Sequence, residues 1–233
     1  MTRRRWIADE VSGDRAVLTG PHAQHLARVL RARVGQEFDV AVNGKVRRGR
    51  VISTADQRVE FELGEEVAES AAPNIILALS IFKFDHMEWA IEKCTELGVS
   101  RIVPVIARRT DSHLATAAAK RLDRWQRIAL AAAQQSRRSA PPEILPPVKL
   151  REVLGIQAAS RIVLSESEIE LMLSEVAASG EIALAIGPEG GWTEEELRLF
   201  RDSGWISASL GKTILRAETA AIAALAVVMA FRS

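Results

Sequence analysis

The chain is poor in cysteine, which limits how its fold can be stabilised. Cys94 is the only cysteine among 233 residues, so no disulfide can form within the chain. Disulfides are typical of proteins that mature in oxidising compartments, so we expect a cytoplasmic location. Apolar residues make up 48% and charged residues 26% of the chain. This composition is typical of a globular protein with one large domain or two small ones.

The sequence also lacks a long apolar run. The longest, Ala220–Ala230, is too short to span a bilayer and is followed by Phe231-Arg232-Ser233, so we interpret it as a buried helix. At the N-terminus, Arg3, Arg4 and Arg5 are not followed by an apolar stretch, so no signal peptide is expected. We therefore expect no membrane partner.

The net charge is small, at +1, but the charges are segregated along the chain. Residues 1–58 and 101–151 carry an excess of Lys and Arg, whereas residues 59–100 and 152–233 carry an excess of Asp and Glu. Basic segments separated by acidic ones are typical of a surface that binds a polyanion. Solvated arginine-rich faces explain the pattern equally well, so both interpretations stay open.

Two ligand-binding motifs are incomplete. Gly211-Lys212-Thr213 has the letters that close a phosphate-binding P-loop, but the glycine needed five residues earlier is replaced by Ile206. His22 and His25 lie three residues apart on an expected helix, without a second pair of ligands nearby. The sequence therefore favours neither a nucleotide phosphate site nor a metal site.

Short strand patterns fill the N-terminal part of the chain: Phe38–Val42, Arg50–Ile52 and Val59–Leu63. Asn43-Gly44 is a strong hairpin signal, and one helix is expected at His22–Leu30. This pattern predicts a small β-barrel-like domain. The acidic, alanine-rich stretch Glu65–Pro73 is typical of a linker.

Strands and helices alternate after Pro73. The expected strands are Ile75–Ile81, Arg101–Ala107, Arg161–Leu164, Glu181–Ile186 and Trp205–Leu210. The expected helices are Asp85–Leu97, Ala117–Gln135, Glu168–Ala178, Thr193–Asp202 and Ala217–Phe231. Such alternation predicts a mostly parallel sheet covered by helices, with a ligand beyond the carboxyl ends of its strands.

A glycine-rich loop follows the strand Glu181–Ile186. Its sequence is Gly187-Pro188-Glu189-Gly190-Gly191-Trp192-Thr193, and Thr193 with Glu196 forms a capping box for the next helix. Three glycines around one carboxylate favour a ligand loop over a plain turn. Elsewhere, Cys94 lies on an apolar helical face and is expected in the core, and Trp6 beside three arginines is a candidate for stacking on bases.

Two C-terminal motifs together resemble a known signature: IGPEGG at Ile186–Gly191 and LGKTILRAETA at Leu210–Ala220. They are similar to the C-terminal signature of bacterial 16S ribosomal RNA (uracil N3) methyltransferases of the SPOUT superfamily. Further similar segments extend the resemblance over almost the whole chain: His22–Arg31, Lys83–Glu88, Thr95–Val99 and Gln135–Arg138. The chain departs from the family pattern at Arg108-Arg109-Thr110, where relatives often have Arg-Ser, and at Ala131–Gln134, where they have a Glu.

The resemblance implies an α/β protein of two domains. Residues 1–70 would form a PUA-like β-barrel that binds RNA, and residues 73–233 a SPOUT α/β methyltransferase domain with a trefoil knot. The family uses S-adenosylmethionine, acts as a homodimer and methylates N3 of a uridine in the 16S ribosomal RNA of the small subunit. Two alternatives stay open: an RNA-binding or ribosome-assembly protein without catalysis, and a SPOUT methyltransferase acting on transfer RNA or another base.

The resemblance and the strand ends together suggest roles for individual residues. The candidates to bind the cofactor are Leu164, Gly187, Pro188, Glu189, Gly190, Gly191, Leu210, Gly211, Ile214 and Leu215. Deprotonation of uracil N3 spreads negative charge onto two carbonyl oxygens, which a guanidinium can stabilise, so Arg216 is the first catalytic candidate. Glu189 or Glu218 could accept the proton, although an Arg216–Glu218 ion pair could instead be purely structural. The candidates to bind RNA are Arg3, Arg4, Arg5, Arg28, Arg31, Arg33, Arg47, Arg48, Arg108, Arg109, Arg137 and Arg138.

Overall fold

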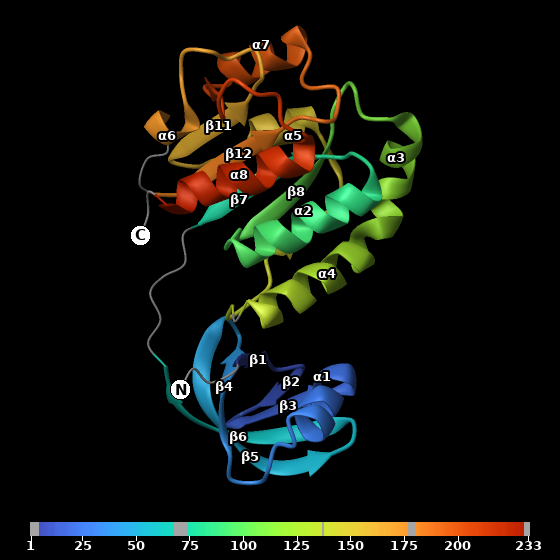
Figure 1. The fold of residues 1–233 in the computed structure, drawn as a ribbon, viewed down its shortest axis with the longest axis vertical. Helices are drawn as coiled ribbons and strands as arrows, with labels where there is room; N and C mark the ends of the chain where they lie inside the picture. Colours follow the sequence, from blue (N-terminus) through green and yellow to red (C-terminus); the bar gives the residue numbers. More distant parts are fainter. Residues whose placement is uncertain (1–4, 68–73, 137, 177–179, 231–233) are drawn as a thin grey trace. The chain divides into compact units, whose positions relative to one another are not determined.

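A computed structural model describes residues 5–67, 74–136, 138–176 and 180–230, and the chain divides into two compact units (Figure 1). The N-terminal unit comprises the described residues of Met1–Ala71 and Ala133–Pro141. The C-terminal unit comprises those of Ala72–Ala132 and Pro142–Ser233. The segment Ala133–Pro141 therefore groups with the N-terminal unit, although the sequence pattern assigns it to the domain that begins at residue 73. Most of the expected linker, residues 68–73, lies outside the described residues.

The N-terminal unit is built on one curled sheet. Its strands are β1 (Arg5–Ile7), β2 (Glu10–Ser12), β3 (Arg15–Thr19), β4 (Glu37–Val42), β5 (Lys45–Ala55) and β6 (Arg58–Glu66), in the order β1-β4-β5-β6-β3-β2. Only Ala8 and Asp9 separate β1 from β2, which are the two edges, so the sheet curls until its edges meet. The backbone N–H of Ala8 donates to Ala41 in β4, and that of Asp9 donates to Val17 in β3. The expected barrel-like domain is confirmed as this curled sheet.

The β4–β5 turn follows the predicted hairpin. Asn43 and Gly44 have φ of 50° and 77°, and Val42 pairs with Lys45 directly across the turn. Two positive φ values are the requirement of the tight hairpin turn for which Asn-Gly is favoured. Local turn chemistry therefore fixes the register of these two strands.

The helix of this unit differs from the expected His22–Leu30. It begins as α1 (Gly20–Gln24), with Pro21 in its first turn, and continues as the π-helical turn η1 (His25–Val29). The Trp6 side chain is 7% exposed and its ring contacts those of His22 and His25, with centroids 6.4 and 6.0 Å away. The stacking role expected for Trp6 is therefore wrong, because the ring is part of the core.

The C-terminal unit contains a parallel sheet. Its strands are β7 (Ile75–Ser80), β8 (Arg101–Ile106), β9 (Glu143–Ile144), β10 (Val148–Lys149), β11 (Ser160–Leu164), β12 (Ile182–Ile186) and β13 (Ile206–Ala208). The order is β10-β8-β7-β12-β11-β13, and β9 also pairs with β8. Every described pairing in this sheet is parallel, which confirms the prediction from the alternation of strands and helices.

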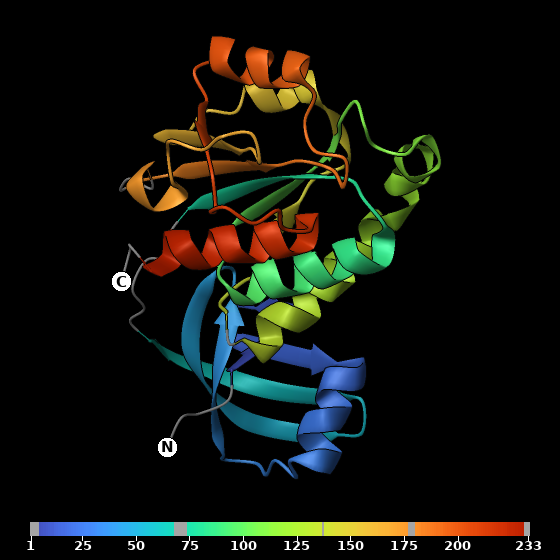
Figure 2. The same ribbon diagram turned by 45° about the horizontal axis from the view of Figure 1, so that its top comes forward.

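Helices cover both faces of the parallel sheet. Figures 1 and 2 show α2 (Phe84–Glu96) and α8 (Ala217–Ala230) on one face and α5 (Leu150–Leu154) and α7 (Glu194–Asp202) on the other. Ile75, Leu77 and Leu79 of β7 belong to the core shared with α2 and α8, and the intervening Ile76 and Ala78 to the core shared with α5 and α7. A strand buried on both faces is apolar throughout, as β7 is.

Two helices are shorter than the sequence pattern predicts. In place of a continuous Ala117–Gln135 helix, the chain forms α3 (Ser112–Ala117), the 3-10 turn η2 (Ala118–Arg121) and α4 (Leu122–Gln135). In place of Glu168–Ala178, the described residues form only α6 (Leu173–Val176), because the Glu168 carboxylate accepts the backbone N–H groups of Glu170 and Leu171 and holds a turn. Among the described residues, no helix is long and apolar enough to cross a membrane.

Candidate active site

A pocket of about 260 Å³ lies beyond the carboxyl ends of β11, β12 and β13, which is where the sequence predicts a ligand. Its walls come from the loops that follow these three neighbouring strands, from the start of α8 and from a few side chains of other segments. The residues that line it are Arg109, Leu164–Ser167, Ile186–Glu189, Gly191, Trp192, Glu194, Leu197, Ala208–Gly211, Thr213–Leu215, Ala217 and Ala220.

The glycine-rich loop after β12 needs its glycines for space and for backbone conformation. A Cβ added to Gly187 would lie 3.2 Å from Nε1 of Trp192, and one added to Gly191 would lie 3.2 Å from a carboxylate oxygen of Glu166. Gly191 also has a φ of 68°, and its N–H donates to Pro188 O over 2.8 Å. The loop is therefore a tight turn whose glycines leave room for the side chains of Trp192 and Glu166 at the pocket wall.

Aromatic rings support this loop from below. The Trp192 ring packs edge-on against the ring of Phe200 in α7, with 5.0 Å between the ring centroids, and the Phe200 ring packs edge-on against that of Trp205, with 5.1 Å between the centroids. All three side chains are buried. The Trp192 end of the loop is therefore anchored in the hydrophobic core.

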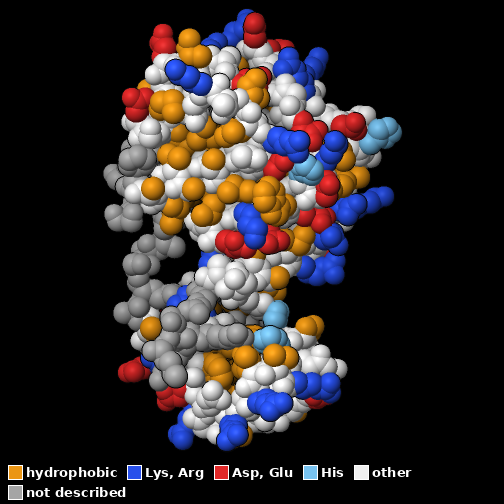
Figure 3. Space-filling model, viewed as in Figure 1, with side chains coloured by type: hydrophobic (Ala, Val, Ile, Leu, Met, Phe, Trp, Pro, Cys, Tyr) orange, Lys and Arg blue, Asp and Glu red, His pale blue; other side chains and the backbone are white. Residues whose placement is uncertain are grey.

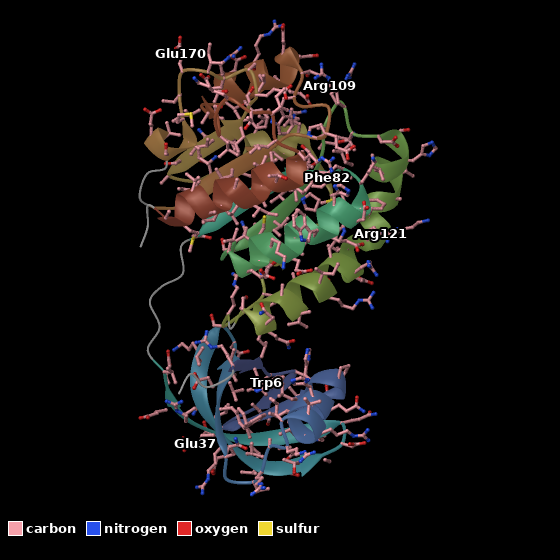
Figure 4. All side chains as sticks on the ribbon, viewed as in Figure 1. Trp6, Glu37, Phe82, Arg109, Arg121 and Glu170 are labelled. Carbon is pink, nitrogen blue, oxygen red and sulfur yellow. The ribbon has the colours of Figure 1, made fainter. Side chains whose placement is uncertain are left out.

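The start of α7 shows the predicted capping box. The Thr193 hydroxyl accepts the N–H of Glu196, while Oε2 of Glu196 accepts the N–H of Thr193. The other oxygen of Glu196 accepts the N–H of Arg108, in the loop after β8, over 2.7 Å. Arg109 of that loop donates from Nη1 to Gly190 O over 2.6 Å and lines the pocket (Figure 4).

The loop after β13 closes another side of the pocket. Gly211 has a φ of 126°, and its N–H donates to the hydroxyl of Ser209, which in turn donates to Gly211 O. Ile214 is 79% exposed although it lines the pocket, and Lys212 does not line it. The P-loop letters at residues 211–213 thus belong to a loop whose lysine does not face this pocket.

The structure gathers nearly all the proposed cofactor-binding residues around one pocket. Of the set chosen from the sequence, only Gly190 does not line it, and this glycine contacts the pocket residue Arg109 instead. Sequence reasoning missed Ser165, Glu166 and Ser167, which follow β11. The rule that selected the ends of β12 and β13 could have found them, because β11 lies between those two strands.

The three catalytic candidates occupy different positions. Glu189 is exposed and lines the pocket. Arg216 is also exposed; it does not line the pocket, although its neighbours Leu215 and Ala217 do. Glu218 is buried, and its Oε1 lies 2.7 Å from Nδ1 of His86 in α2. The Arg216–Glu218 ion pair considered from the sequence is absent among the described residues.

The arginines proposed to bind RNA fall into groups. Arg3, Arg4 and Arg137 lie outside the described residues. Arg28, Arg47 and Arg48 form ion pairs with Asp56, Asp14 and Asp39. Arg5 is half-buried in β1, and partial burial lowers the pKa of Arg138. The residues left exposed without an ion pair in the described structure are Arg31, Arg33, Arg108 and Arg109, and Arg109 instead donates hydrogen bonds to backbone carbonyl groups.

The pocket combines apolar walls with an excess of negative charge. Three carboxylates line it, those of Glu166, Glu189 and Glu194, against the single guanidinium of Arg109. Such a lining attracts a cationic ligand and repels a phosphate. Within the described part of the chain, no three His, Cys, Asp or Glu side chains are grouped as a metal site would require.

The comparisons with known proteins place this fold and pocket in a class of α/β RNA-modifying proteins. Residues 69–229 match the RNA methyltransferase domain family. The chain is 34% identical to the ribosomal RNA small subunit methyltransferase E of Synechocystis, over 90% of this chain and 71% of that one. It is 29% identical to the protein of that name in Aquifex aeolicus, over 97% and 99%.

Solved structures agree with the sequence relatives. The ribosomal RNA small subunit methyltransferase E of Neisseria gonorrhoeae, bound to S-adenosyl methionine, is 33% identical with a TM-score of 0.84, over 99% of this chain and 98% of that one. A putative methyltransferase of Legionella pneumophila, in complex with the same cofactor, is 29% identical with a TM-score of 0.83, over 99% and 98%. The chain belongs to the family of ribosomal RNA small subunit methyltransferases E.

Proposed function

We propose that this protein transfers a methyl group from S-adenosylmethionine to N3 of a uridine in the 16S ribosomal RNA of the small ribosomal subunit. The observation that carries the proposal is the pocket at the ends of β11, β12 and β13, with its glycine-rich loop and acidic lining. Relatives of the same family with S-adenosyl methionine bound support it. A substrate of this kind implies a cytoplasmic location, as the single cysteine also suggests.

The pocket residues fit this cofactor chemically. S-adenosylmethionine, when bound, supplies an electrophilic methyl group on a positively charged sulfonium. Glu166, Glu189 and Glu194 provide the negative charge that a cation needs. Leu164, Ile186 and Leu215 provide apolar walls, and Gly187 and Gly191 bring the backbone of the glycine-rich loop to the pocket lining.

Arg216 is our proposed residue for stabilising charge on the reacting base. Its guanidinium is exposed beside the pocket, on the turn between β13 and α8, where an RNA base can reach it. A guanidinium there stabilises the negative charge that develops on the uracil oxygens as N3 loses its proton. Glu189 is the better placed proton acceptor, because Glu218 is buried against His86 and would instead hold the start of α8.

Single-turnover methylation of small ribosomal subunits tests this assignment. Arg216→Ala should lower the methylation rate on the order of a hundredfold while leaving RNA affinity unchanged. Lys212→Ala is the matched control, because Lys212 is another exposed cation of the same loop and has no proposed role in the reaction. An Arg216→Ala variant that methylates at the native rate would remove Arg216 from the mechanism. Native binding of RNA without any methyl transfer by the wild-type protein would favour the non-catalytic alternative.

The active form is proposed to be a homodimer that uses the face formed by α2 and α8. Hydrophobic side chains gather over these helices in Figure 3, and α8 is apolar along its whole length after Thr219. Ala226 of α8 is exposed and Ile222 and Met229 are half-buried, so apolar surface remains after the helix has packed on the sheet. Sedimentation at micromolar concentration should give a dimer, and Ala226→Glu should give a monomer. A wild-type monomer would contradict this part of the proposal.

The N-terminal unit is proposed to bind RNA as a PUA-like domain. Of the arginines proposed to bind RNA, Arg31 and Arg33 are the described residues of that unit that are exposed without an ion pair, so they are the first candidates to contact phosphates. We also propose that the C-terminal unit contains the trefoil knot that the family resemblance implies.

A further inference from the structure

We propose that Arg109 is a positioning residue that holds the glycine-rich loop after β12 in the conformation that binds the cofactor. It would do so from outside that loop, because it belongs to the segment that follows β8. The proposal rests on the S-adenosylmethionine site proposed above. It gives Arg109 a role that differs from the RNA contact expected from the basic character of its segment.

The guanidinium of Arg109 donates hydrogen bonds to the glycine-rich loop. Its Nη1 donates to Gly190 O over 2.6 Å and lies 3.4 Å from Trp192 O. Hydrogen bonds from a charged donor are stronger than those between neutral groups. One side chain therefore holds two carbonyl groups on either side of Gly191, whose positive φ makes the turn.

The stem of Arg109 also packs on the loop. A Cβ added to Gly190 would lie 3.3 Å from Cδ and 3.6 Å from Cβ of Arg109. The absence of a side chain at Gly190 thus allows the arginine to lie directly on the loop backbone. A side chain at position 190 would therefore crowd Arg109, although Gly190 does not itself line the pocket.

Glu196 makes a second connection between the same two segments. Its side chain is buried, and it accepts the N–H of Arg108 with one oxygen and the N–H and hydroxyl of Thr193 with the other, over 2.7, 2.8 and 2.9 Å. The strands β8 and β12 are not neighbours, because β7 lies between them. These side-chain bonds therefore connect two loops that the sheet itself does not connect.

A glycine-rich loop needs such connections. Glycine loses more backbone freedom on ordering than any other residue, so a loop with three glycines pays a large entropic cost if the ligand alone must order it. Fixing the loop beforehand removes that cost from binding. Arg109 should therefore increase cofactor affinity through the order that it imposes on the loop.

Arg108 provides a control of equal charge at the adjacent position. It is exposed, and within the described structure no acceptor pairs with its guanidinium. Arg108→Ala and Arg109→Ala therefore change the net charge equally but remove different contacts. Arg109→Lys keeps the charge and offers three N–H donors, but it replaces the planar guanidinium with a compact ammonium.

Calorimetry with S-adenosylmethionine in the absence of RNA is the first measurement. Arg109→Ala should weaken binding on the order of tenfold to a hundredfold, Arg109→Lys by less, and Arg108→Ala should bind as the wild type does. Filter binding to 16S RNA at several salt concentrations should show an effect of Arg108→Ala and none of Arg109→Ala. Arg108→Ala should lower the salt slope by about one unit, and Arg109→Ala should leave it unchanged. Loss of RNA binding by Arg109→Ala with native cofactor affinity would overturn the proposal.

Hydrogen exchange of the free protein tests the same contact without any ligand. Amides of residues 189–193 should exchange faster in Arg109→Ala than in the wild type or Arg108→Ala, because the loop has lost its anchor. Equal exchange in all three proteins would overturn the positioning role. If the wild-type protein fails to bind S-adenosylmethionine, the proposed function fails, yet this exchange experiment still decides whether Arg109 holds the loop.

Discussion

The His86→Ala substitution should destabilise the C-terminal unit more than Glu218→Gln does. The side chain of Glu218 is 5% exposed, and its Oε1 lies 2.7 Å from Nδ1 of His86. Loss of His86 leaves this buried carboxylate without its described partner, whereas a glutamine at position 218 still offers a carbonyl oxygen to the imidazole. The two changes disrupt the same contact between α2 and α8 with unequal consequences.

The size of the effect follows from burial. Leaving a buried carboxylate without its hydrogen-bond partner costs about 3 kcal/mol or more. The His86 side chain is 33% exposed, so water enters part of the vacated space, and we expect a loss of about 2–3 kcal/mol. Glu218→Gln exchanges a hydrogen bond to a charged acceptor for one to a neutral acceptor and should cost about 1 kcal/mol.

Urea unfolding followed by tryptophan fluorescence measures both losses. Trp89, Trp125, Trp192 and Trp205 belong to the C-terminal unit, so its transition dominates the signal. With a slope of about 2 kcal/mol per molar urea, His86→Ala should lower the midpoint by about 1 M and Glu218→Gln by about 0.5 M. A His86→Ala midpoint equal to the wild type would refute the reasoning. Complete loss of methyl transfer in a Glu218→Gln protein of native stability would make Glu218 the proton acceptor.

Three further predictions follow from the described contacts. Cys94 is buried in the core, and burial raises the pKa of its thiol to about 12, so a thiol reagent at pH 8 should modify it only after unfolding; rapid modification of the native protein would contradict this. Replacing Arg31 and Arg33 together by alanine should lower the salt slope of RNA binding by about two units. Replacing Arg47 and Arg48 together by alanine should mainly lower the unfolding midpoint, because those arginines are paired with Asp14 and Asp39. Equal salt slopes for the two double variants would argue against this division. The backbone N–H groups of Glu170, Leu171 and Ile169 lower the pKa of Glu168 below its usual 4.5, so the stability that this carboxylate gives to its turn is present above pH 4.5 and is lost as the pH falls through the lowered pKa. Hydrogen exchange of these amides, corrected for the intrinsic rate, should become faster as the pH falls through that pKa. Glu168→Gln should abolish this pH dependence.

Local signals explain most of what the sequence predicts correctly. The Asn43-Gly44 turn, the capping box of Thr193 and Glu196, and the apolar run of β7 each depend on neighbouring residues, so their patterns are visible in the sequence. The rule that ligands bind at the carboxyl ends of parallel strands then places the pocket. The fold class and the pocket were therefore within reach of sequence reasoning.

Contacts between distant residues explain most of what it misses. His86 and Glu218 are 132 residues apart, and Arg109 and Gly190 are 81 residues apart, so no local pattern reports either pair. The turn at Glu168 replaced an expected helix because its carboxylate bonds nearby backbone N–H groups, which competes with helix formation. The role of Trp6 was predicted wrongly because its burial depends on a helix distant in sequence, which places His22 and His25 against its ring.

The central claim is methyl transfer to a uridine, and mapping the modified base tests it most directly. Small ribosomal subunits from a strain without this protein should be incubated with the purified protein and S-adenosylmethionine, and their 16S RNA digested and analysed by mass spectrometry. The account predicts one new methyl group, on N3 of one uridine, and on the order of a hundredfold less product with Arg216→Ala in the same reaction time. No methylation, or a methyl group on another base or at another atom, would contradict it.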